Sequence, residues 1–243
     1  MNTKYNRHII LVAAVLLFTA ATLNADYLPS GKPNPVELLA PPPAAGSAED
    51  RADLEEAAAV SSAAPDKLVA RARGEDSLNI FHFAPAIGAW FQSGKFPKLE
   101  ALIKQVEKES KTVTSTGKTY WKRLRPYHVD PARFNRAIED EYYTDYSYPS
   151  GHSTRATVFA LLLADIFPDK RDGILMKGRE SGWLRVIGGV HYPTDVYAGR
   201  VLGQAIVREL KASPAFQADF ESAKAEAASG RAELAAASAG GKN

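Results

Sequence analysis

Two histidines occupy sequence settings that suit chemistry on an anionic group. His152 ends a Tyr-Pro-Ser-Gly-His segment, just where a helix that carries a long apolar run is predicted to begin. If the helix begins at Gly151, the N–H groups of its first turn and the positive end of its dipole form a site for an anion. Glycine also lets the backbone approach that anion closely. His152 would then lie beside an oxyanion site.

The second histidine, His191, is followed four residues later by Asp195, with Pro193 between them at the start of a predicted helix. A carboxylate in the first turn of that helix can reach back to one ring nitrogen. It would fix the tautomer of His191 and stabilise the imidazolium, as the acid of a catalytic triad does. The other ring nitrogen is then available as a nucleophile.

A basic segment at residues 118–126 supplies positive charge, because four of its nine residues are lysine or arginine. Lys118 and Arg125 are seven residues apart and would share a face if both lay on one helix. Arg185 adds a third cation. Three cations, a helix N-terminus and two histidines together suit a tetrahedral oxyanion, such as a phosphoryl group during transfer.

These three segments resemble, in order and spacing, the signature of the type-2 phosphatidic acid phosphatase (PAP2) and vanadium haloperoxidase superfamily. The signature is Lys-x6-Arg-Pro, then Pro-Ser-Gly-His, then Arg-x5-His-x3-Asp, and ten specified positions agree. Within this superfamily the chain looks like a bacterial class A non-specific acid phosphatase. The proline-rich residues 38–43 before an acidic helix and the start of the last helix at residues 213–217 also fit, and the resemblance covers about residues 27–228.

The resemblance implies an acid phosphatase, a phosphoric monoester hydrolase that forms a phosphohistidine and needs no metal or other cofactor. His191 would attack phosphorus, Asp195 would orient His191, and His152 would protonate the leaving alcohol and later activate water. The residues implied to hold the phosphoryl oxygens are Lys118, Arg125, Ser150, Gly151 and Arg185. Such an enzyme would act on small-molecule phosphate esters and be inhibited by vanadate.

This mechanism predicts a bell-shaped pH profile on the acid side of neutrality. It needs a neutral His191 together with a protonated His152, and a free histidine has a pKa of about 6.5. One departure from the family pattern concerns Arg185, since the family usually has serine where this chain has Leu184. Ser181, one helical turn earlier, could supply the hydroxyl instead, and without it Arg185 would be held less firmly.

The same residues leave other functions open. A vanadate-dependent haloperoxidase would use His191 to hold vanadate, a lipid phosphate phosphatase would use the same site on lipid, and an oxyanion-binding protein would use it without turnover. His152, His191 and Asp195 could also ligate a metal, although the nearby cations oppose this. Ser150 with His191 and Asp195 mimics a serine-hydrolase triad, but the Gly-x-Ser-x-Gly turn is missing.

Several histidines and tyrosines are predicted to serve the structure rather than the chemistry. His82 and His128 are expected to be structural or surface residues. The tyrosines near the second segment are expected mainly to pack, with leaving-group contacts as the alternative. These tyrosines are Tyr142, Tyr143, Tyr146 and Tyr148.

The N-terminus predicts export. Lys4 and Arg7 precede an apolar run at residues 9–21, which is too short to span a bilayer and is typical of a secretory signal peptide. Residues 1–25 hold two of the 30 basic residues and none of the 28 acidic ones, so the processed chain is neutral. Neutrality offers no case for nucleic-acid binding. We expect a periplasmic or secreted protein without stable membrane insertion, and a homo-oligomer remains open.

The chain of 243 residues has no cysteine, is 45% hydrophobic, and shows no alternating strand pattern. We therefore predict an all-α, compact helical bundle whose buried central helix covers residues 151–167. The other expected helices are residues 47–64, 67–73, 83–92, 97–115, 171–187 and 193–210, a short one starting at 130–131, and one starting at 213–214. The predicted divisions are a signal peptide (1–25), a proline-rich segment (26–46), an all-α phosphatase domain (47–228) and a flexible tail (229–243).

Overall fold

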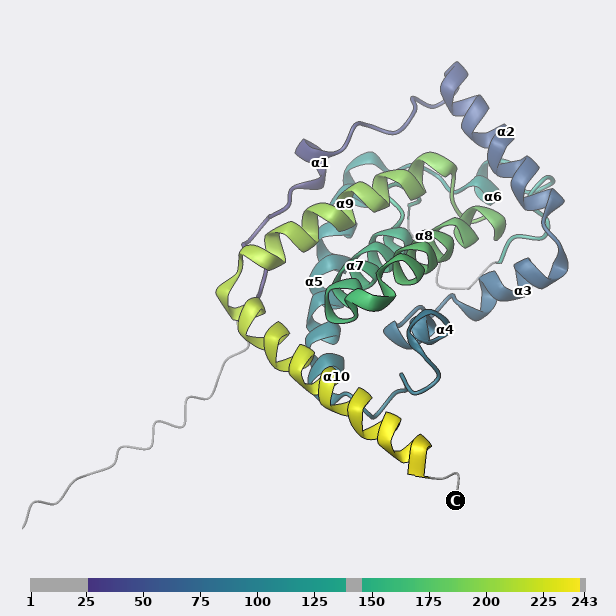
Figure 1. The fold of residues 1–243 in the computed structure, drawn as a ribbon. Helices are drawn as coiled ribbons and strands as arrows, with labels where there is room; N and C mark the ends of the chain where they lie inside the picture. Colours follow the sequence, from purple (N-terminus) through teal and green to yellow (C-terminus); the bar gives the residue numbers. More distant parts are fainter. Residues whose placement is uncertain (1–25, 139–145, 241–243) are drawn as a thin grey trace, which may run out of the picture.

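The computed structural model describes residues 26–138 and 146–240, with side chains to residue 232, and every regular element in these ranges is a helix. Figure 1 shows the elements in sequence colours. They are α1 (Pro35–Leu38), α2 (Ala48–Ala63), α3 (Asp66–Gly74), η1 (Ile80–Phe83), α4 (Ala84–Ile87), α5 (Pro97–Trp121), α6 (Pro126–Val129), α7 (Gly151–Ile166), η2 (Pro168–Lys170), α8 (Arg171–Ile187), α9 (Pro193–Ala212) and α10 (Pro214–Gly240). The predicted all-α class is confirmed.

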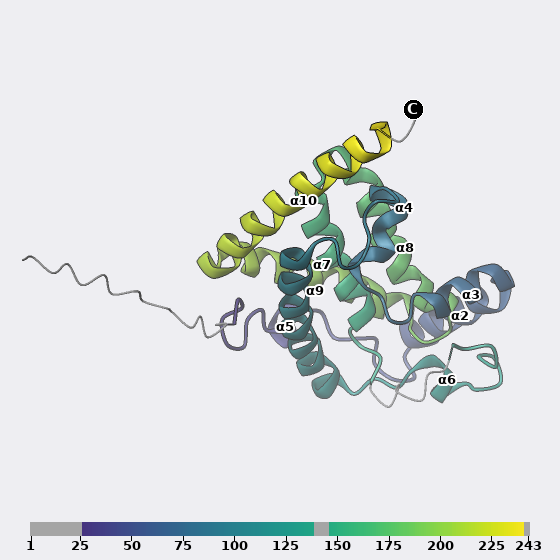
Figure 2. The same cartoon turned by 90° about the horizontal axis from the view of Figure 1, so that it is seen from below.

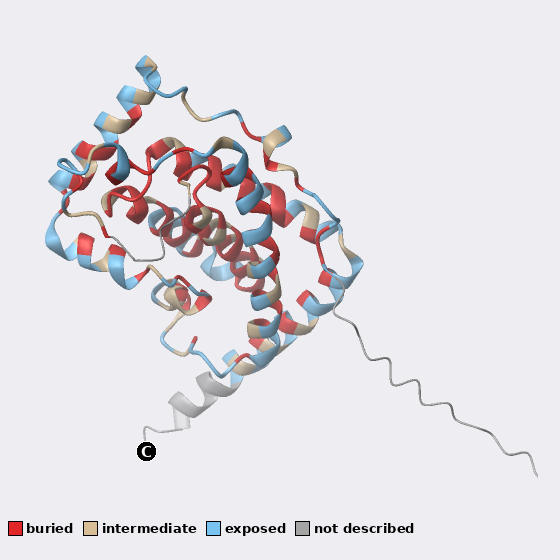
Figure 3. Ribbon diagram, turned by 180° about the vertical axis from the view of Figure 1, so that it is seen from behind, coloured by how far each residue is buried: buried red, intermediate tan, exposed pale blue. Residues whose placement is uncertain are grey.

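Helix α7 is the buried centre of the molecule, as predicted. It packs mainly against α8 and α9, and α5 covers a further side. Figure 3 shows it as buried along most of its length, whereas α2 and α10 expose one face. Because apolar residues surround the axis of α7, no face of this helix can be left to water at low cost. The helix therefore begins, with Gly151, deep in the fold.

Glycines let α9 lie unusually close to the first turn of α7. A Cβ atom added at Gly199 would approach the carbonyl oxygen of Ser150 to 2.6 Å and the Cβ of Ser153 to 2.9 Å. The backbone N–H of Ser150 donates to the carbonyl oxygen of Asp195 at 3.0 Å. This close approach brings the second and third sequence segments together.

Helix α5 is longer than predicted. It was expected to end at residue 115 but continues to Trp121, so that Lys118 lies in its last turn. Lys122 then takes the left-handed conformation, with φ of 50°, and turns the chain away from the helix axis. Lys118 and Arg125 therefore do not share a helical face, and that prediction was wrong. The chain reversal, rather than helical periodicity, brings the two cations to the same place.

Two short helices also differ from the prediction. The expected helix at residues 83–92 is split into η1 and α4 and ends at Gly88, whose φ of 145° suits glycine. The helix expected to begin at residues 130–131 is absent. Instead, α6 ends there, with Asp130 as its C-cap. The carboxylate of Asp130 accepts from the backbone N–H and the guanidinium of Arg133.

Helix α10 continues through the segment that the sequence indicated as a flexible tail after residue 228. It lies along α5 and α9, as the two views in Figures 1 and 2 show. The backbone N–H groups of Lys98 and Leu99 donate to the Glu226 carboxylate, and Arg231 forms an ion pair with Asp169 at 2.7 Å. These contacts, with the high helix propensity of alanine, account for helix beyond residue 228.

The proline-rich residues 26–46 are extended except for the single turn of α1, and they run against α5 and α9. Glu109 of α5 accepts from the backbone N–H groups of Tyr27 and Leu28. The predicted signal peptide, residues 1–25, lies outside the described residues. Among the helices that the structure does describe, none combines the length and the hydropathy that crossing a membrane requires.

Candidate active site

A pocket of about 390 Å³ opens at the N-terminus of α7, where the three predicted segments meet. It is lined by residues of α5, α7 and α8 and of the loops before α6 and α9. The predicted site residues that line it are Lys118, Arg125, Gly151, His152, Arg185 and His191. Asp195 and Ser150 lie behind this wall, and both are inaccessible to solvent.

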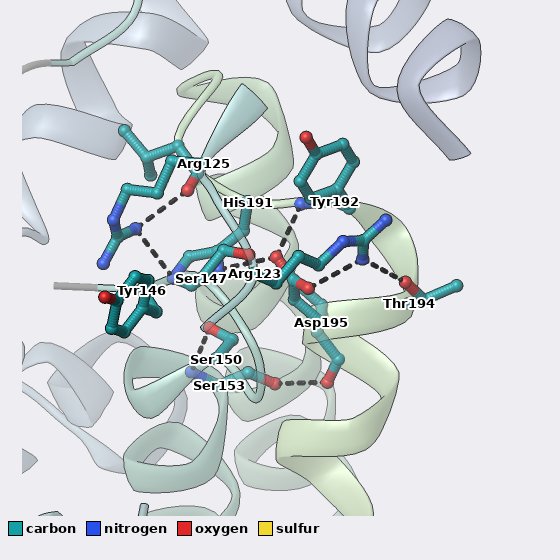
Figure 4. A network of polar contacts seen from close by, with 12 residues as sticks. Arg123, Arg125, Tyr146, Ser147, Ser150, Ser153, His191, Tyr192, Thr194 and Asp195 are labelled. Carbon is teal, nitrogen blue, oxygen red and sulfur yellow. Dashed lines mark hydrogen bonds and ion pairs between the residues drawn. The ribbon is translucent and has the colours of Figure 1, made fainter. Parts of the chain in front are cut away.

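The imidazole of His191 is fixed from both sides, as Figure 4 shows. Its Nδ1 lies 3.1 Å from Oδ2 of Asp195, and its Nε2 lies 3.2 Å from Nη1 of Arg125. A guanidinium can only donate, so Nε2 must be the acceptor and Nδ1 must carry the proton given to Asp195. This assignment places the ring lone pair of His191 on Nε2, where it accepts the hydrogen bond from Arg125.

The first turn of α7 has the form expected of an anion site. Ser150 is the N-cap, and its Oγ accepts from the backbone N–H of Ser153 at 3.3 Å. A Cβ added at Gly151 would meet only ordinary contacts, at 3.5 Å from Thr114 and 3.9 Å from Lys118. Packing against the described residues therefore does not demand glycine here, and its role in letting a ligand approach the backbone stays a prediction.

His152 points one unsatisfied nitrogen into buried space. Its Nε2 is buried without a hydrogen-bond partner in the described part of the chain, and its Nδ1 lies 3.5 Å from Nη2 of Arg155. Burial lowers the pKa of His152 well below its usual value, and repulsion by Arg185 and Arg155 lowers it further. A buried polar atom without a partner is unusual in a native protein and points to a ligand.

Three cations surround the same pocket, and all are largely buried. Nη1 of Arg125 donates to the carbonyl oxygen of Val190 at 2.8 Å, and Nζ of Lys118 donates to the carbonyl oxygen of Tyr146. Nη2 of Arg185 contacts Oδ1 of Asp76 at 2.8 Å. Among the described residues, two carboxylates, those of Asp76 and Glu107, line this pocket beside five lysine and arginine side chains, so this lining favours an anionic ligand.

Arg185 is oriented by residues that the sequence did not indicate. Ser181, considered as a replacement for the serine absent at Leu184, is buried and donates its hydroxyl to Glu75 at 2.7 Å. Leu184 is buried among apolar side chains. Asp76 and the carbonyl oxygen of Ala72 hold the Arg185 guanidinium instead. Ala72 and Asp76 lie more than 100 residues before Arg185 in the sequence, so no local motif could indicate them.

His82, His128 and Tyr148 do not line the pocket, whereas Tyr146 lies beside it and its carbonyl oxygen accepts from Lys118. Nδ1 of His82 accepts from the backbone N–H of Asn79 and completes a capping box, and His128 is exposed. The hydroxyl of Tyr148 donates to the carbonyl oxygen of Ala40 at 2.5 Å. Tyr142 and Tyr143 lie outside the described residues. Within the described ranges, no group of three or more His, Asp or Glu side chains is arranged to hold a metal ion.

Comparisons with known proteins agree with this arrangement. The profile of the PAP2 superfamily matches residues 110–217. A non-specific acid phosphatase from Salmonella typhi is 29% identical over 236 residues, which cover 93% of each chain. One from Providencia stuartii is 33% identical over 146 residues, which cover 59% of each chain.

A solved structure has the same fold. It is the crystal structure of a transmembrane PAP2-type phosphatidylglycerolphosphate phosphatase from Bacillus subtilis, with a TM-score of 0.50 and 22% sequence identity. The match covers 69% of this chain and 87% of the other. At this identity the likeness concerns the fold alone.

Proposed function

Because the chain belongs to the PAP2 superfamily, we propose that it is an acid phosphatase that hydrolyses small phosphate monoesters through a phosphohistidine at His191. The observation that carries the proposal is the tautomer of His191, which is fixed by its hydrogen bonds. Its Nδ1–H is held by Asp195, and its Nε2 carries the ring lone pair, which accepts from Arg125 until that guanidinium turns to a phosphoryl oxygen. His191 lines a pocket with buried cations. The curated relatives named non-specific acid phosphatase support the same reaction.

In the first step, Nε2 of His191 attacks phosphorus and the bond from phosphorus to the ester oxygen breaks. His152 gives its proton to that oxygen, so the alcohol leaves neutral. The Nδ1–H of the phosphorylated ring stays hydrogen bonded to Asp195, whose carboxylate stabilises the positive charge on the imidazole. In the second step, His152 takes a proton from water, and the resulting hydroxide attacks phosphorus and displaces His191.

The cations and the helix N-terminus stabilise charge on the three phosphoryl oxygens. Lys118, Arg125 and Arg185 are held by backbone carbonyls and Asp76, so they need little rearrangement when the transition state forms. The N–H of Gly151 adds a donor at the positive end of α7. These groups take the role that metal ions play in many phosphoryl-transfer sites, and their charge opposes the binding of a metal.

The pKa of His152 is lowered before a substrate binds. A negatively charged phosphoryl group opposes the repulsion by Arg185 and Arg155 and therefore raises the pKa of His152. The substrate itself thus favours the protonated form that the first step needs. Since His191 must remain neutral at the same time, activity should peak on the acid side of neutrality.

A trapping experiment tests the nucleophile. Wild type, His191→Ala and the control His128→Ala are mixed with a 32P-labelled aryl phosphate monoester and quenched in alkali, which preserves phosphohistidine. We expect an alkali-stable, acid-labile label on wild type and on His128→Ala, because His128 is exposed and outside the pocket. His191→Ala should carry no label and lose activity by at least about 10³-fold. Full activity of His191→Ala would contradict the mechanism.

Further assays separate the alternative functions. Vanadate should inhibit monoester hydrolysis, whereas peroxide-dependent oxidation of halide would indicate a haloperoxidase. Activity on lipid phosphate without activity on soluble monoesters would indicate a lipid phosphatase. Activity that survives exhaustive treatment with a chelator is expected if no metal takes part.

We also propose that residues 1–25 are removed on export and that the processed protein is periplasmic or secreted. The basic and apolar pattern of this segment supports the proposal. Mass spectrometry of protein isolated from the periplasm would test it. A mature chain that still begins at Met1 would contradict it.

A further inference from the structure

Arg123 joins the carboxylate behind the nucleophile to a helix far away in the sequence. Its Nη1 donates to Oδ1 of Asp195 at 2.9 Å, and its Nη2 donates to Oδ2 of Asp53 at 2.8 Å. Asp53 belongs to α2, which lies outside the matched PAP2 region. The guanidinium is largely buried, and it lies over the ring of Tyr192 at 3.7 Å.

A second set of contacts ties α2 to the first turn of α9. The backbone N–H of Thr194 donates to Oδ1 of Asp53 at 3.2 Å, and the Thr194 hydroxyl donates to Oδ2 of the same carboxylate. Asp50, one turn earlier on α2, accepts from Nη2 of Arg123 at 3.1 Å. Three carboxylates, those of Asp50, Asp53 and Asp195, thus meet one guanidinium.

The hydrogen bonds of Asp195 are divided between its two oxygens. Oδ1 accepts from Arg123, whereas Oδ2 accepts from Nδ1 of His191 and from the backbone N–H of Tyr192 at 3.0 Å. Figure 4 shows this division. With Oδ1 fixed by Arg123, the carboxylate cannot rotate to offer its other oxygen to His191 without losing a charge-assisted hydrogen bond.

We propose that Arg123 is a positioning residue for the phosphatase reaction, which aligns Asp195 and tunes the proton affinity of the Asp195–His191 pair, and that Asp53 of α2 is its anchor. The inference rests on the proposed function, in which Asp195 holds the proton of His191. It assigns a chemical role to α2, an element that the sequence signature does not include.

The surrounding charges determine whether Arg123 raises or lowers the proton affinity of the Asp195–His191 pair. Burial raises the pKa of the Asp195 carboxyl, while Arg123 and the N–H of Tyr192 oppose that rise. Burial alone would lower the pKa of Arg123, but Asp195 and Asp53 outweigh it and the pKa is raised. Arg123 therefore stays charged, and its positive charge makes the Asp195–His191 pair release a proton more readily.

Other charged or titratable groups face this pair and remain in every variant used below except the one replaced. They come from α2, α5, α7, α8 and the loops before α6, α7 and α9. These groups are Asp50, Asp53, Lys118, Arg125, Tyr148, His152, Arg185 and Tyr192.

The test compares Arg123→Met and Arg123→Lys with Arg133→Met. Arg133 also ties α2 to the loop beyond α6, through Glu55 at 2.7 Å, but it does not contact Asp195. Arg123→Met should lower kcat by about 10- to 100-fold, the usual cost of losing a partner one shell behind a reacting group, while KM changes little. The acid limb of the kcat profile should move to higher pH, because the pair holds its proton more tightly without the cation.

The two other variants separate charge from tethering. Arg123→Lys keeps the charge but cannot reach both carboxylates, so kcat should be intermediate and the acid limb should stay near that of wild type. Arg133→Met should leave kcat and the pH profile unchanged. Equal kcat in Arg123→Met and Arg133→Met, or a loss of kcat without movement of the acid limb, would overturn the proposal.

Asp53→Asn provides a test if Arg123→Met does not fold. It removes a negative charge and keeps an oxygen for Thr194, so the acid limb should move the opposite way, to lower pH. If the acid limb of Asp53→Asn does not move, or moves to higher pH, Asp53 does not anchor Arg123 as proposed. The 15N shifts of His191, followed against pH without substrate, report the same change. They remain measurable if the chain proves not to be a phosphatase, so the two proposals can fail separately.

Discussion

At the scale of single residues, the two histidines of the pocket depend on neighbouring side chains, His191 for its tautomer and His152 for its pKa. Asp195 and Arg125 together select the tautomer of His191. Burial and two arginines lower the pKa of His152 and so favour its neutral form. A substitution behind the pocket wall should therefore also change the reaction.

Asp195→Asn is a direct test of the tautomer. If the amide oxygen faces Arg123, the amide NH2 faces His191 and donates to Nδ1, which forces the proton onto Nε2 and removes the nucleophilic lone pair. The opposite orientation would place the NH2 against the guanidinium. We expect kcat to fall by roughly 10⁴-fold, as when the orienting acid of a serine protease triad is replaced in this way.

Steady-state kinetics and the 15N shifts of His191 would check this prediction, with the exposed Asp169→Asn as a control that should match wild type. A variant whose kcat stays within tenfold of wild type would show that Asp195 does not set the tautomer. Retained vanadate binding would confirm that the pocket is still formed.

The sequence predicted the contacts between neighbours and missed those between distant residues. The spacing of His191 and Asp195 implied their hydrogen bond because four residues around a helix start place the two groups together. Arg123 was visible only as part of a basic run, since its partner Asp53 is 70 residues away. The partner of Ser181 was missed because Glu75, which accepts from its hydroxyl, is 106 residues away.

At the scale of elements, the site depends on where helices begin and end. Helix α5 must stop at Trp121, and Lys122 must take the left-handed conformation, for Arg125 to reach the pocket that Lys118 lines. The sequence predicted α7 and α8 almost to the residue, because apolar pattern and proline mark their limits. It could not predict the length of α5, whose last six residues lie beyond the predicted end and include Gly117, a residue more common just after helices than inside them.

Gly199→Ala tests whether the close approach of α9 and α7 serves the site. The new methyl group would meet backbone and Cβ atoms of α7 at 2.6–3.1 Å, so α7 must move where it carries Ser150 and Gly151. Overpacking of this kind costs about 1–3 kcal/mol of stability, and kcat should fall because the anion site shifts.

Gly173→Ala is the matched control, since its Cβ would meet only Ala86 at an ordinary 3.6 Å. Alanine is the better helix former, so this change should stabilise α8 by up to about 1 kcal/mol and leave kcat unchanged. Urea unfolding and kinetics would be compared for both variants. A Gly199→Ala protein as stable and active as the control would show that the two helices need not be this close.

At the scale of the whole molecule, the site draws on parts of the chain that precede the matched PAP2 region at residue 110. The segment after α3 supplies Asp76, which holds Arg185, and α2 supplies Asp53, which holds Arg123. The helices within the matched region carry the reacting groups. The helices before it fix the orientation of those groups, so the fold as a whole determines the geometry of the pocket.

Stability against pH provides a global test of this coupling. His152 has a lowered pKa in the folded empty protein and an ordinary one, about 6.5, in the unfolded chain. Below pH 6.5 the unfolded chain therefore binds a proton that the folded protein does not, so the free energy of unfolding should fall as pH falls. The slope from one such group is about 1.4 kcal/mol per pH unit. In His152→Asn this contribution should be missing.

Inorganic phosphate should reverse the effect, because an anion in the pocket favours protonated His152. Phosphate at 100 times the Kd measured at pH 7.5 raises the free energy of unfolding by about 2.7 kcal/mol at that pH, and the same phosphate concentration should give a larger gain at pH 5 in wild type. The ionisation of phosphate itself affects wild type and His152→Asn alike, so the difference between the two proteins isolates the histidine. Thermal unfolding of both proteins with and without phosphate at the two pH values would measure it. Equal gains in the two proteins at both pH values would mean that His152 does not sense the bound anion, and its part in proton transfer would have to be given to another group.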